Sequence, residues 1–340
     1  MWLPHSMRRV RDMFNPLVRA PGPCPAGPRR PPRPQVTERA EPRTQDTGKR
    51  LFSGPDPRRH PSGGTVALWL LIVIATGLLA CGGSSSDPLE DALVLVVSSD
   101  LAVGRERVLV SAIDAENRSL VTDQPIELVF VAPDGSPSEE VPGRFIWAVP
   151  DVRGLWVAEV DFDRAGAWTF RIRTGDDRVI EGAPFSVSPE PRTVGIGERA
   201  PPSDSKTLPD TPLESLTTDP APDLRLYRTT VAQAVGSGRP SVIVFATPAF
   251  CTSETCGPVL DAAKPLIDAY PGVNWIHVEI YENLYASSLD DLELTRAVVE
   301  WGLPNEPWVF VVDGAGIVTH RFEGVLDGAE LVAALDRVTS

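Results

Sequence analysis

The stretch Phe245-Ala-Thr-Pro-Ala-Phe-Cys251-Thr-Ser-Glu-Thr-Cys256-Gly-Pro258 decides the interpretation of this chain. It begins at the end of the apolar run at residues 242–245, which is typical of a strand buried on both faces. A helical pattern follows it. Two cysteines therefore lie at the junction of a buried strand and a helix. At the N-terminal end of a helix, several backbone N–H groups face a thiol and stabilise its thiolate form.

These two cysteines are each other's natural partners. The chain has four cysteines, and the other two, Cys24 and Cys81, lie in the N-terminal part that we assign below to a leader and a signal segment. Cys251 is nearer the end of the strand, so it is the candidate attacking thiol, and Cys256 is the candidate resolving thiol. The hydroxyls of Thr252, Ser253 and Thr255 can donate hydrogen bonds to sulfur. No cofactor is expected.

The segments around the pair alternate between helix and strand patterns, which predicts an α/β domain with a central mixed sheet flanked by helices. An Asp-Gly turn at residue 313 favours a hairpin between the last two strands. The expected elements are helix 230–235, strand 241–246, helix 257–269, strand 273–281, helix 289–301, strand 308–312, strand 317–322 and helix 328–338.

This C-terminal third of the chain resembles the thioredoxin-like superfamily. The resemblance rests on the element order, on the cysteines at the strand-to-helix junction, and on the stretch Glu306-Pro307-Trp308. In that superfamily a cis-proline opens the strand that faces the active cysteines, and Pro307 occupies that place. The resemblance implies exchange of thiols and disulfides through Cys251 and Cys256, with Pro307 and Trp308 bordering the groove for a partner protein.

The spacing departs from the Cys-x-x-Cys of thioredoxins, because four residues separate these cysteines. In an unbroken helix their Cα atoms would lie ~8–9 Å apart, beyond the ~7 Å limit for a disulfide. Either residues 252–255 form a loop, with the helix starting after Gly257-Pro258, or the first helical turn unwinds when the pair oxidises. Thioredoxins also carry a buried acid in the preceding strand as a proton relay, and residues 241–246 contain none.

A second interpretation is a thiol peroxidase. The Cys-x4-Cys spacing is that of the Q-type peroxiredoxins, and Thr247-Pro248-Ala249-Phe250-Cys251-Thr252 resembles their Thr-Pro-Gly-Cys-Thr stretch. Their P-x-x-x-T-x-x-C pattern is broken here, since proline rather than threonine precedes Cys251 by three residues. No arginine that could polarise a peroxide lies between Arg239 and Arg296.

Two further interpretations stay open. Copper-delivery lipoproteins of thioredoxin fold use two thiolates and a histidine, which here would be Cys251, Cys256 and His277. A lone strand histidine such as His277 is more often a structural residue than a ligand. Alternatively, the pair is a static disulfide in a non-catalytic envelope lipoprotein. The absence of cysteines from the preceding module favours a working pair.

Residues 91–188 show period-2 alternation interrupted by turn signals, and no helical pattern competes there. Seven short strands predict an all-β sandwich that resembles the immunoglobulin fold without its cysteine pair. The module lacks cysteine and histidine, so we expect it to be a spacer or docking module. The expected strands are 93–97, 107–113, 126–131, 144–149, 155–162, 167–173 and 179–185.

The N-terminal part resembles a bacterial lipoprotein signal. Fifteen apolar residues at 66–80 follow Arg58-Arg59 and end in Leu-Leu-Ala before Cys81 and a Gly/Ser run. They match the apolar region of a signal peptide better than a spanning helix, which needs about 20 residues. The resemblance implies a lipid anchor on Cys81 and a location on the extracytoplasmic face of a membrane. An uncleaved signal anchor would place the modules on the same side.

The net charge of −14 argues against nucleic acid as a partner, because polyanions require a basic face. We therefore expect a membrane-anchored thiol-disulfide oxidoreductase whose partners are the thiols or disulfides of envelope proteins. The predicted parts are a Pro/Arg-rich leader at 1–57 that is either disordered or not translated; a signal peptide with lipobox at 58–81; a tether at 82–90; the β-sandwich at 91–188; a Pro-rich linker at 189–222; and the thioredoxin-like domain at 223–340.

Overall fold

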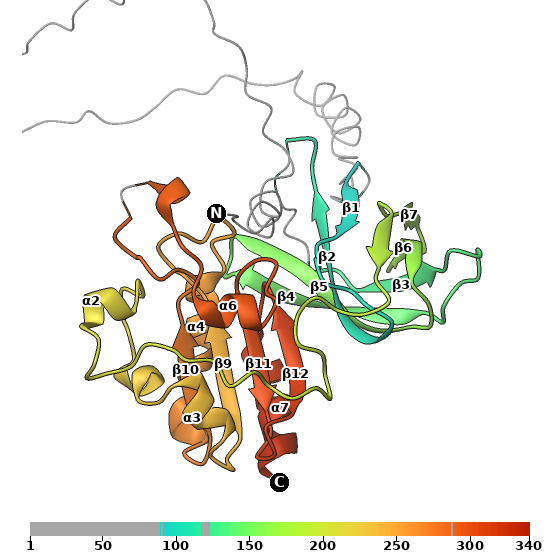
Figure 1. The fold of residues 1–340 in the computed structure, drawn as a ribbon. Coiled ribbons are helices and arrows are strands. Elements are labelled where there is room, and N and C mark those ends of the chain that lie inside the picture. The colour runs from blue at the N-terminus through green and yellow to red at the C-terminus, as the bar shows by residue number, and fades with distance from the viewer. Residues whose placement is uncertain (1–88, 90, 117, 119–122, 287) are drawn as a thin grey trace, which may run out of the picture. The chain divides into compact units, whose positions relative to one another are not determined.

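The computed structural model describes residues 89, 91–116, 118, 123–286 and 288–340 (Figure 1). The leader, the signal peptide and Cys81 lie outside the described residues. Within the described ranges, no helix is both long enough and apolar enough to cross a membrane.

The first module consists of antiparallel strands, whose hydrogen-bonded order is β1-β2-β5-β4-β3-β6-β7, with β8 paired to β6. The predicted strands are present, with ends that shift by a few residues. Their bounds are β1 Leu93–Val96, β2 Gly104–Ile113, β3 Ile126–Val131, β4 Val141–Val149, β5 Arg153–Phe162, β6 Gly166–Thr174, β7 Val179–Glu181 and β8 Phe185–Val187.

These strands form one continuous sheet rather than the two separate sheets of the predicted sandwich. The reason is β4, which pairs with β3 through its first residues and with β5 through the remainder. Alternate residues of β2, β3, β5 and β6 nevertheless share one core, in which Phe130 and Phe170 stack. The sheet therefore bends around this apolar core.

The last predicted strand, 179–185, is divided into β7 and β8. Gly182 lies between them, and a Cβ atom there would come within 2.3 Å of the Phe170 ring. Pro184 follows, and proline has no N–H to donate to a sheet. Close packing and a missing donor thus end the strand at Glu181.

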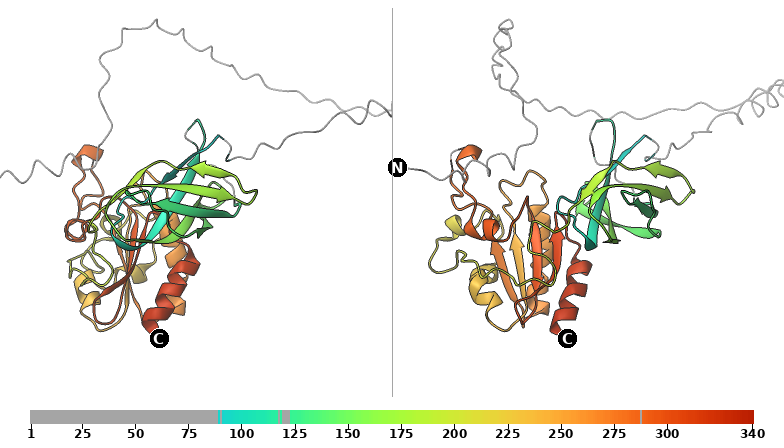
Figure 2. Two further views of the ribbon diagram at one scale, coloured as in Figure 1. Left: turned by 90° about the vertical axis from the view of Figure 1, so that its right-hand side faces the viewer. Right: turned by 45° about the vertical axis from the view of Figure 1, so that its right-hand side comes forward.

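The second module contains a four-stranded mixed sheet, as the sequence predicts. The strands are β9 Ser241–Phe245, β10 Asn274–Val278, β11 Trp308–Val312 and β12 Val318–Glu323, in the order β10-β9-β11-β12. β10 runs parallel to β9, and β11 is antiparallel to both β9 and β12. Every residue of β9 and of β11 is buried, because helices cover both faces of the sheet (Figures 1 and 2).

Two apolar cores lie on opposite faces of this sheet. Val242 and Val244 of β9 face one core and Ile243 and Phe245 face the other, and the first core includes residues of α4 (Cys256–Ala263) and α7 (Gly328–Thr339), the second residues of α3 (Val231–Val235) and α6 (Arg296–Glu300). The helices are α2 Leu213–Leu216, η2 Leu224–Tyr227, α3 Val231–Val235, α4 Cys256–Ala263, α5 Leu266–Ala269, η3 Leu289–Asp291, α6 Arg296–Glu300 and α7 Gly328–Thr339.

Two predicted helices are interrupted. The one expected at 257–269 is divided into α4 and α5, and Pro265 is the residue that caps α5. A proline inside a helix removes one hydrogen bond and clashes with the preceding turn. The helix expected at 289–301 is reduced to η3 and α6, because Leu294 between them forms a β-bridge with Tyr281.

The segment at 189–222, predicted as an extended linker, packs along the second module. Arg199 forms a β-bridge with Ile317, and the N–H of Ala200 donates to the carbonyl of Gly316. Ala200 and Leu216 are members of the two cores of that module. This segment has the composition of a linker, but backbone pairing with the β11–β12 hairpin holds it against the second module.

A buried ion cluster surrounds Arg321 of β12. Its guanidinium lies 3.0 Å from Asp100 and 2.6 Å from Glu106, and the side chains of Arg321, Asp100 and Glu106 are only 6%, 2% and 11% exposed. The hydroxyl of Thr193 lies 2.6 Å from the same guanidinium. Burial raises the pKa of Glu106, and the bond from Arg321 opposes that rise. Without Arg321, two buried carboxylates would have no cation.

We expect Arg321→Met to lower the free energy of unfolding by about 3–5 kcal/mol at neutral pH, because it leaves the buried carboxylates uncompensated. Urea denaturation would measure this loss. The control is Arg105→Met, which removes an exposed ion pair with Glu159 and should cost at most about 1 kcal/mol. Equal losses in the two variants would contradict the cluster's role.

Candidate active site

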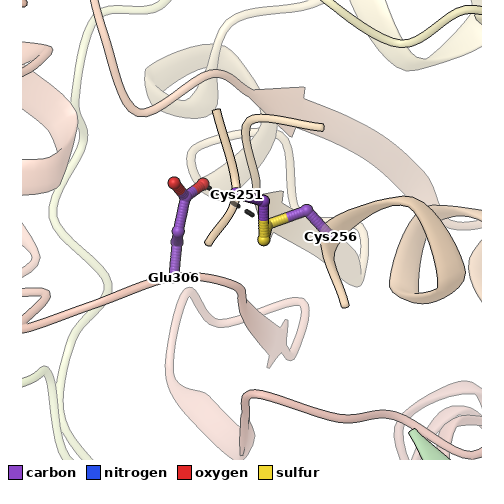
Figure 3. A group of neighbouring side chains, drawn as sticks. All are labelled: Cys251, Cys256 and Glu306. Atoms are coloured by element: carbon purple, nitrogen blue, oxygen red, sulfur yellow. Dashed lines mark hydrogen bonds between the residues drawn. A yellow bond between two sulfur atoms is a disulfide. The ribbon is translucent and has the colours of Figure 1, made fainter. Parts of the chain in front are cut away.

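A disulfide joins Cys251 to Cys256, with their Cα atoms 6.1 Å apart (Figure 3). Residues 252–255 form a non-helical turn in which Glu254 has a φ of 61°. In this oxidised form, a non-helical turn fits both geometries that the spacing allows, the loop and the helical turn that unwinds on oxidation. The helix α4 begins at Cys256 itself, so Pro258 lies in its first turn, where a proline loses no hydrogen bond.

The two sulfurs differ in exposure. Cys256 is fully buried among the residues of one core, whereas Cys251 is partly exposed and packs against that core's edge. An external thiolate can therefore approach Cys251 more readily than Cys256. This asymmetry fits the order expected from the sequence, in which Cys251 exchanges with a partner and Cys256 resolves.

A chain of hydroxyl groups accompanies Cys251. Its sulfur lies 3.2 Å from the Ser253 hydroxyl, which lies 2.8 Å from the Thr255 hydroxyl. The sequence predicts three candidate hydroxyl donors to sulfur, those of Thr252, Ser253 and Thr255. Thr252 is exposed, and the hydroxyl that the structure places beside the sulfur belongs to Ser253.

A carboxyl group faces the buried sulfur. Glu306 Oε2 lies 3.4 Å from Cys256 Sγ and accepts the backbone N–H of Thr247 at 2.6 Å (Figure 3). Burial raises the pKa of Glu306 to about 7, the charge of Glu279 adds to the rise, and the bond from Thr247 opposes it. A disulfide sulfur has no proton to donate, so this contact is a hydrogen bond only when the Glu306 carboxyl is protonated.

Glu306 was missed in the sequence analysis, which sought a buried acid only in the strand before the cysteines. The missed signal was its position: it directly precedes Pro307, the residue that the resemblance places opposite the pair. The peptide bond between them is cis, as the resemblance implies.

Glu279 supports the loop that leads to Cys251. Its carboxylate is buried just beyond the end of β10 and accepts bonds from the Thr217 hydroxyl at 3.0 Å and the Thr218 N–H at 2.5 Å. The Thr218 hydroxyl in turn accepts the N–H of Ala249, two residues before Cys251. This carboxylate thereby ties the segment at 217–218 to the active loop.

His277 does not join the cysteines. It is buried, its Nε2 donates to the carbonyl of Ala246 at 2.9 Å, and its Nδ1 accepts from the Tyr227 hydroxyl at 2.7 Å. Burial lowers its pKa, which favours the neutral ring. Both nitrogens are occupied, so His277 is not available as a third ligand beside the sulfurs.

Trp308, which was expected to border the groove for a partner, is a buried residue. Its ring is buried and stacks on Phe310 at a centroid distance of 5.8 Å, and its indole N–H donates to Asn305. As the first residue of β11, Trp308 belongs to the core on the face opposite Cys256. Pro307 is buried as well.

The aromatic pair next to the loop of Cys251 is Phe250 with Tyr281, whose rings meet edge to face.

An arginine reaches the loop from outside the stretch that the sequence analysis searched. Arg153, the first residue of β5, donates to the carbonyl of Ser253 at 2.8 Å and pairs with Glu254 at 3.3 Å. These acceptors orient its guanidinium toward the backbone and the carboxylate of the loop. The nearest threonine before Cys251 is Thr247, which is buried and whose hydroxyl accepts the N–H of Ile280.

Comparison with known proteins leaves the family open. No protein-family model matches the chain, and no curated protein matches it. Among solved structures, a putative thiol:disulfide interchange protein DsbE from Chlorobium tepidum is 12% identical, with a TM-score of 0.31, over 44% of this chain and 100% of that one. The Lin-41 filamin domain is 16% identical, with a TM-score of 0.19, over 29% and 92%. A superoxide reductase (neelaredoxin) from Ignicoccus hospitalis is 17% identical, with a TM-score of 0.19, over 29% and 80%. Function must therefore be argued from the site itself.

The raised pKa of Glu306 predicts a pH-dependent stability. An unfolded chain releases this proton near pH 4.5 and the folded protein near pH 7, so the free energy of unfolding should fall as pH rises across that window. The expected loss is on the order of 2 kcal/mol, and Glu306→Gln should abolish it.

Urea denaturation of the oxidised protein at pH 5 and pH 8 would measure the effect as the difference between wild type and variant. Glu254→Gln, which removes a carboxylate 71% exposed on the same loop, is the matched control and should follow the wild type. Parallel pH profiles for wild type and Glu306→Gln would contradict the prediction.

Proposed function

We propose that this protein is a thiol-disulfide oxidoreductase that works through Cys251 and Cys256. One observation carries the proposal: a disulfide at a strand-to-helix junction has one partly exposed sulfur and one buried sulfur in contact with a carboxyl group. Exchange requires these parts, namely an accessible sulfur, a protected resolving sulfur and a group that can take its proton. A purely structural disulfide has no need of the carboxyl group.

We further propose a thioredoxin-like fold for the second module and an immunoglobulin-like fold for the first. The mixed sheet with helices on both faces, the pair after β9 and the proline before β11 support the former assignment. Antiparallel strands around one core support the latter.

The reaction with a partner disulfide proceeds in two balanced steps. The Cys251 thiolate attacks one partner sulfur, so the partner's disulfide breaks, one partner thiolate leaves, and a mixed disulfide forms. The Cys256 thiol then passes its proton to the Glu306 carboxylate and attacks Cys251 Sγ, which releases the second partner thiolate. The partner gains two electrons and the pair loses two. The reverse sequence oxidises a partner dithiol.

We also propose that the protein is lipid-anchored through Cys81 on the extracytoplasmic face of a membrane and acts on the thiols or disulfides of envelope proteins. The apolar run at 66–80, which ends before Cys81, supports the anchor. An extracytoplasmic compartment permits a stable disulfide, which a reducing cytosol would not.

Single cysteine variants should separate the two thiols. With excess oxidised glutathione, Cys256→Ser should accumulate a mixed disulfide on Cys251, because nothing resolves it, whereas Cys251→Ser should react at least tenfold more slowly at the buried Cys256. Mass spectrometry of a peptide that contains both positions would measure the adducts.

In the wild type, the pair should equilibrate with glutathione buffers at a potential between about −270 and −120 mV, as in known oxidoreductases. A reduction potential of the pair below about −300 mV would indicate a static disulfide instead.

Glu306→Gln should slow the resolving step about 100-fold and leave the first attack unchanged, since only the proton of Cys256 depends on the carboxylate. The measurement is the lifetime of the Cys251–glutathione adduct after mixing reduced protein with oxidised glutathione. Glu254→Gln should behave as wild type. Unchanged resolution in Glu306→Gln would exclude Glu306 as the proton acceptor.

A further inference from the structure

Three different ligand atoms meet at this site. One atom each from Cys251, Cys256 and Glu306 lies within 4.8 Å of the others, and this is a combination that can hold a metal ion (Figure 3). We propose that the reduced protein binds Zn²⁺ through the two thiolates and the Glu306 carboxylate, with a fourth position open, and that disulfide formation excludes the metal. The proposal needs only that a chemical reductant can open the disulfide, and it does not depend on exchange with a partner protein.

The distances suit a tetrahedral ion. A thiolate sulfur ~2.3 Å and a carboxylate oxygen ~2.0 Å from zinc, at tetrahedral angles, lie ~3.5 Å from each other. Cys256 Sγ and Glu306 Oε2 are 3.4 Å apart, so this pair already has the spacing of two ligands on one ion. Reduction frees Cys251 Sγ, which must move away from Cys256 Sγ to the ~3.8 Å that separates two thiolates on zinc.

Two of the three ligands, Glu306 and Cys256, are held in place by the surrounding structure, and the third, Cys251, is accessible to solvent. The Thr247 N–H, itself within a buried residue, holds the Glu306 carboxylate at 2.6 Å, which is the kind of outer contact that orients a metal ligand. Cys256 is fixed at the start of α4 and is fully buried. Cys251 is partly exposed, so an ion can enter from its side.

The donor set selects the class of metal. Two thiolates disfavour Mg²⁺ and Ca²⁺, which prefer oxygen ligands, and a carboxylate is a poor ligand for Cu(I), which prefers soft sulfur. Zn²⁺ accepts both kinds of donor. Because both nitrogens of His277 are occupied, the set differs from the two-thiolate, one-histidine copper site considered from the sequence.

Binding and oxidation compete for the same sulfur electrons. Two thiols lose two protons when they coordinate Zn²⁺, and no electrons are transferred. When a disulfide-containing oxidant then takes two electrons from the thiolates, the Cys251–Cys256 bond forms and the oxidant's disulfide breaks. The oxidant takes up two protons from water and becomes a dithiol, and Zn²⁺ leaves with its oxidation state unchanged. Bound zinc therefore protects the pair from oxidation.

The test uses the full-length protein, reduced with a phosphine under nitrogen and freed of reductant. Zn²⁺ would be titrated against a colorimetric chelator, and Co²⁺ would report tetrahedral thiolate ligation through its absorption spectrum. We expect one zinc ion per chain at this site, and at least 100-fold weaker binding after oxidation. Glu306→Gln should bind at least tenfold more weakly and should change the Co²⁺ ligand-field bands, while Glu254→Gln should bind like the wild type.

The double variant Cys251→Ser/Cys256→Ser keeps Cys24 and Cys81 and so reports any binding by the leader or the signal segment. The proposal is overturned if this variant retains the zinc ion, if oxidation leaves affinity unchanged, or if Glu306→Gln binds as tightly as Glu254→Gln. Glutathione exchange measured on the same samples separates the two proposals. Exchange without zinc binding overturns only the metal site, and zinc binding without exchange supports the site while it overturns the oxidoreductase.

Discussion

The site depends on one geometric constraint: a disulfide must close over four intervening residues while the second cysteine starts a helix. A continuous helix would hold the two Cα atoms ~8–9 Å apart, and the turn at 252–255 reduces this separation to 6.1 Å. Because α4 begins at Cys256, that sulfur is drawn into the core, while Cys251 stays at the surface end of the loop. The unequal exposure of the two sulfurs, on which an ordered exchange depends, is thus a consequence of where the helix starts.

The site also depends on the carboxyl group of Glu306, whose pKa is set by opposing effects of its surroundings. Burial favours the neutral form of Glu306 and the nearby charge of Glu279 adds to that effect, whereas the bond from Thr247 favours the charged form. Burial dominates, so the pKa rises to about 7. A group with this pKa can be protonated beside a disulfide and charged beside a thiol or a cation. The same residue can therefore serve proton transfer in one state and ligation in another.

The sequence predicted most of the elements but not which of them meet at the site. The apolar runs of β9 and β11 indicated buried strands, and the bounds of β11 were predicted correctly at 308–312. Periodicity could not show that Pro265 would divide a helix or that the segment at 189–222 would pair with a hairpin. Glu306 was missed for a related reason. In the antiparallel register Trp308 pairs with Phe245, so two residues further along residue 306 faces residue 247. Only the strand pairing, which local pattern does not specify, brings this carboxyl group to the cysteines.

Opening the disulfide need not disorder the loop at 252–255, because noncovalent contacts contribute about as much free energy to its structure as the disulfide does. Closing a ring of about six residues stabilises the folded chain by about 2 kcal/mol in the chain-entropy estimate. The bond from Arg153 to the Ser253 carbonyl and the bond between the Ser253 and Thr255 hydroxyls contribute on the order of 1 kcal/mol each. The exposed ion pair between Arg153 and Glu254 adds little. Noncovalent contacts thus rival the covalent bond, and the reduced loop should stay close to its oxidised shape. The two thiols would then remain near each other and near Glu306, which is the arrangement that both rapid resolution and metal binding require.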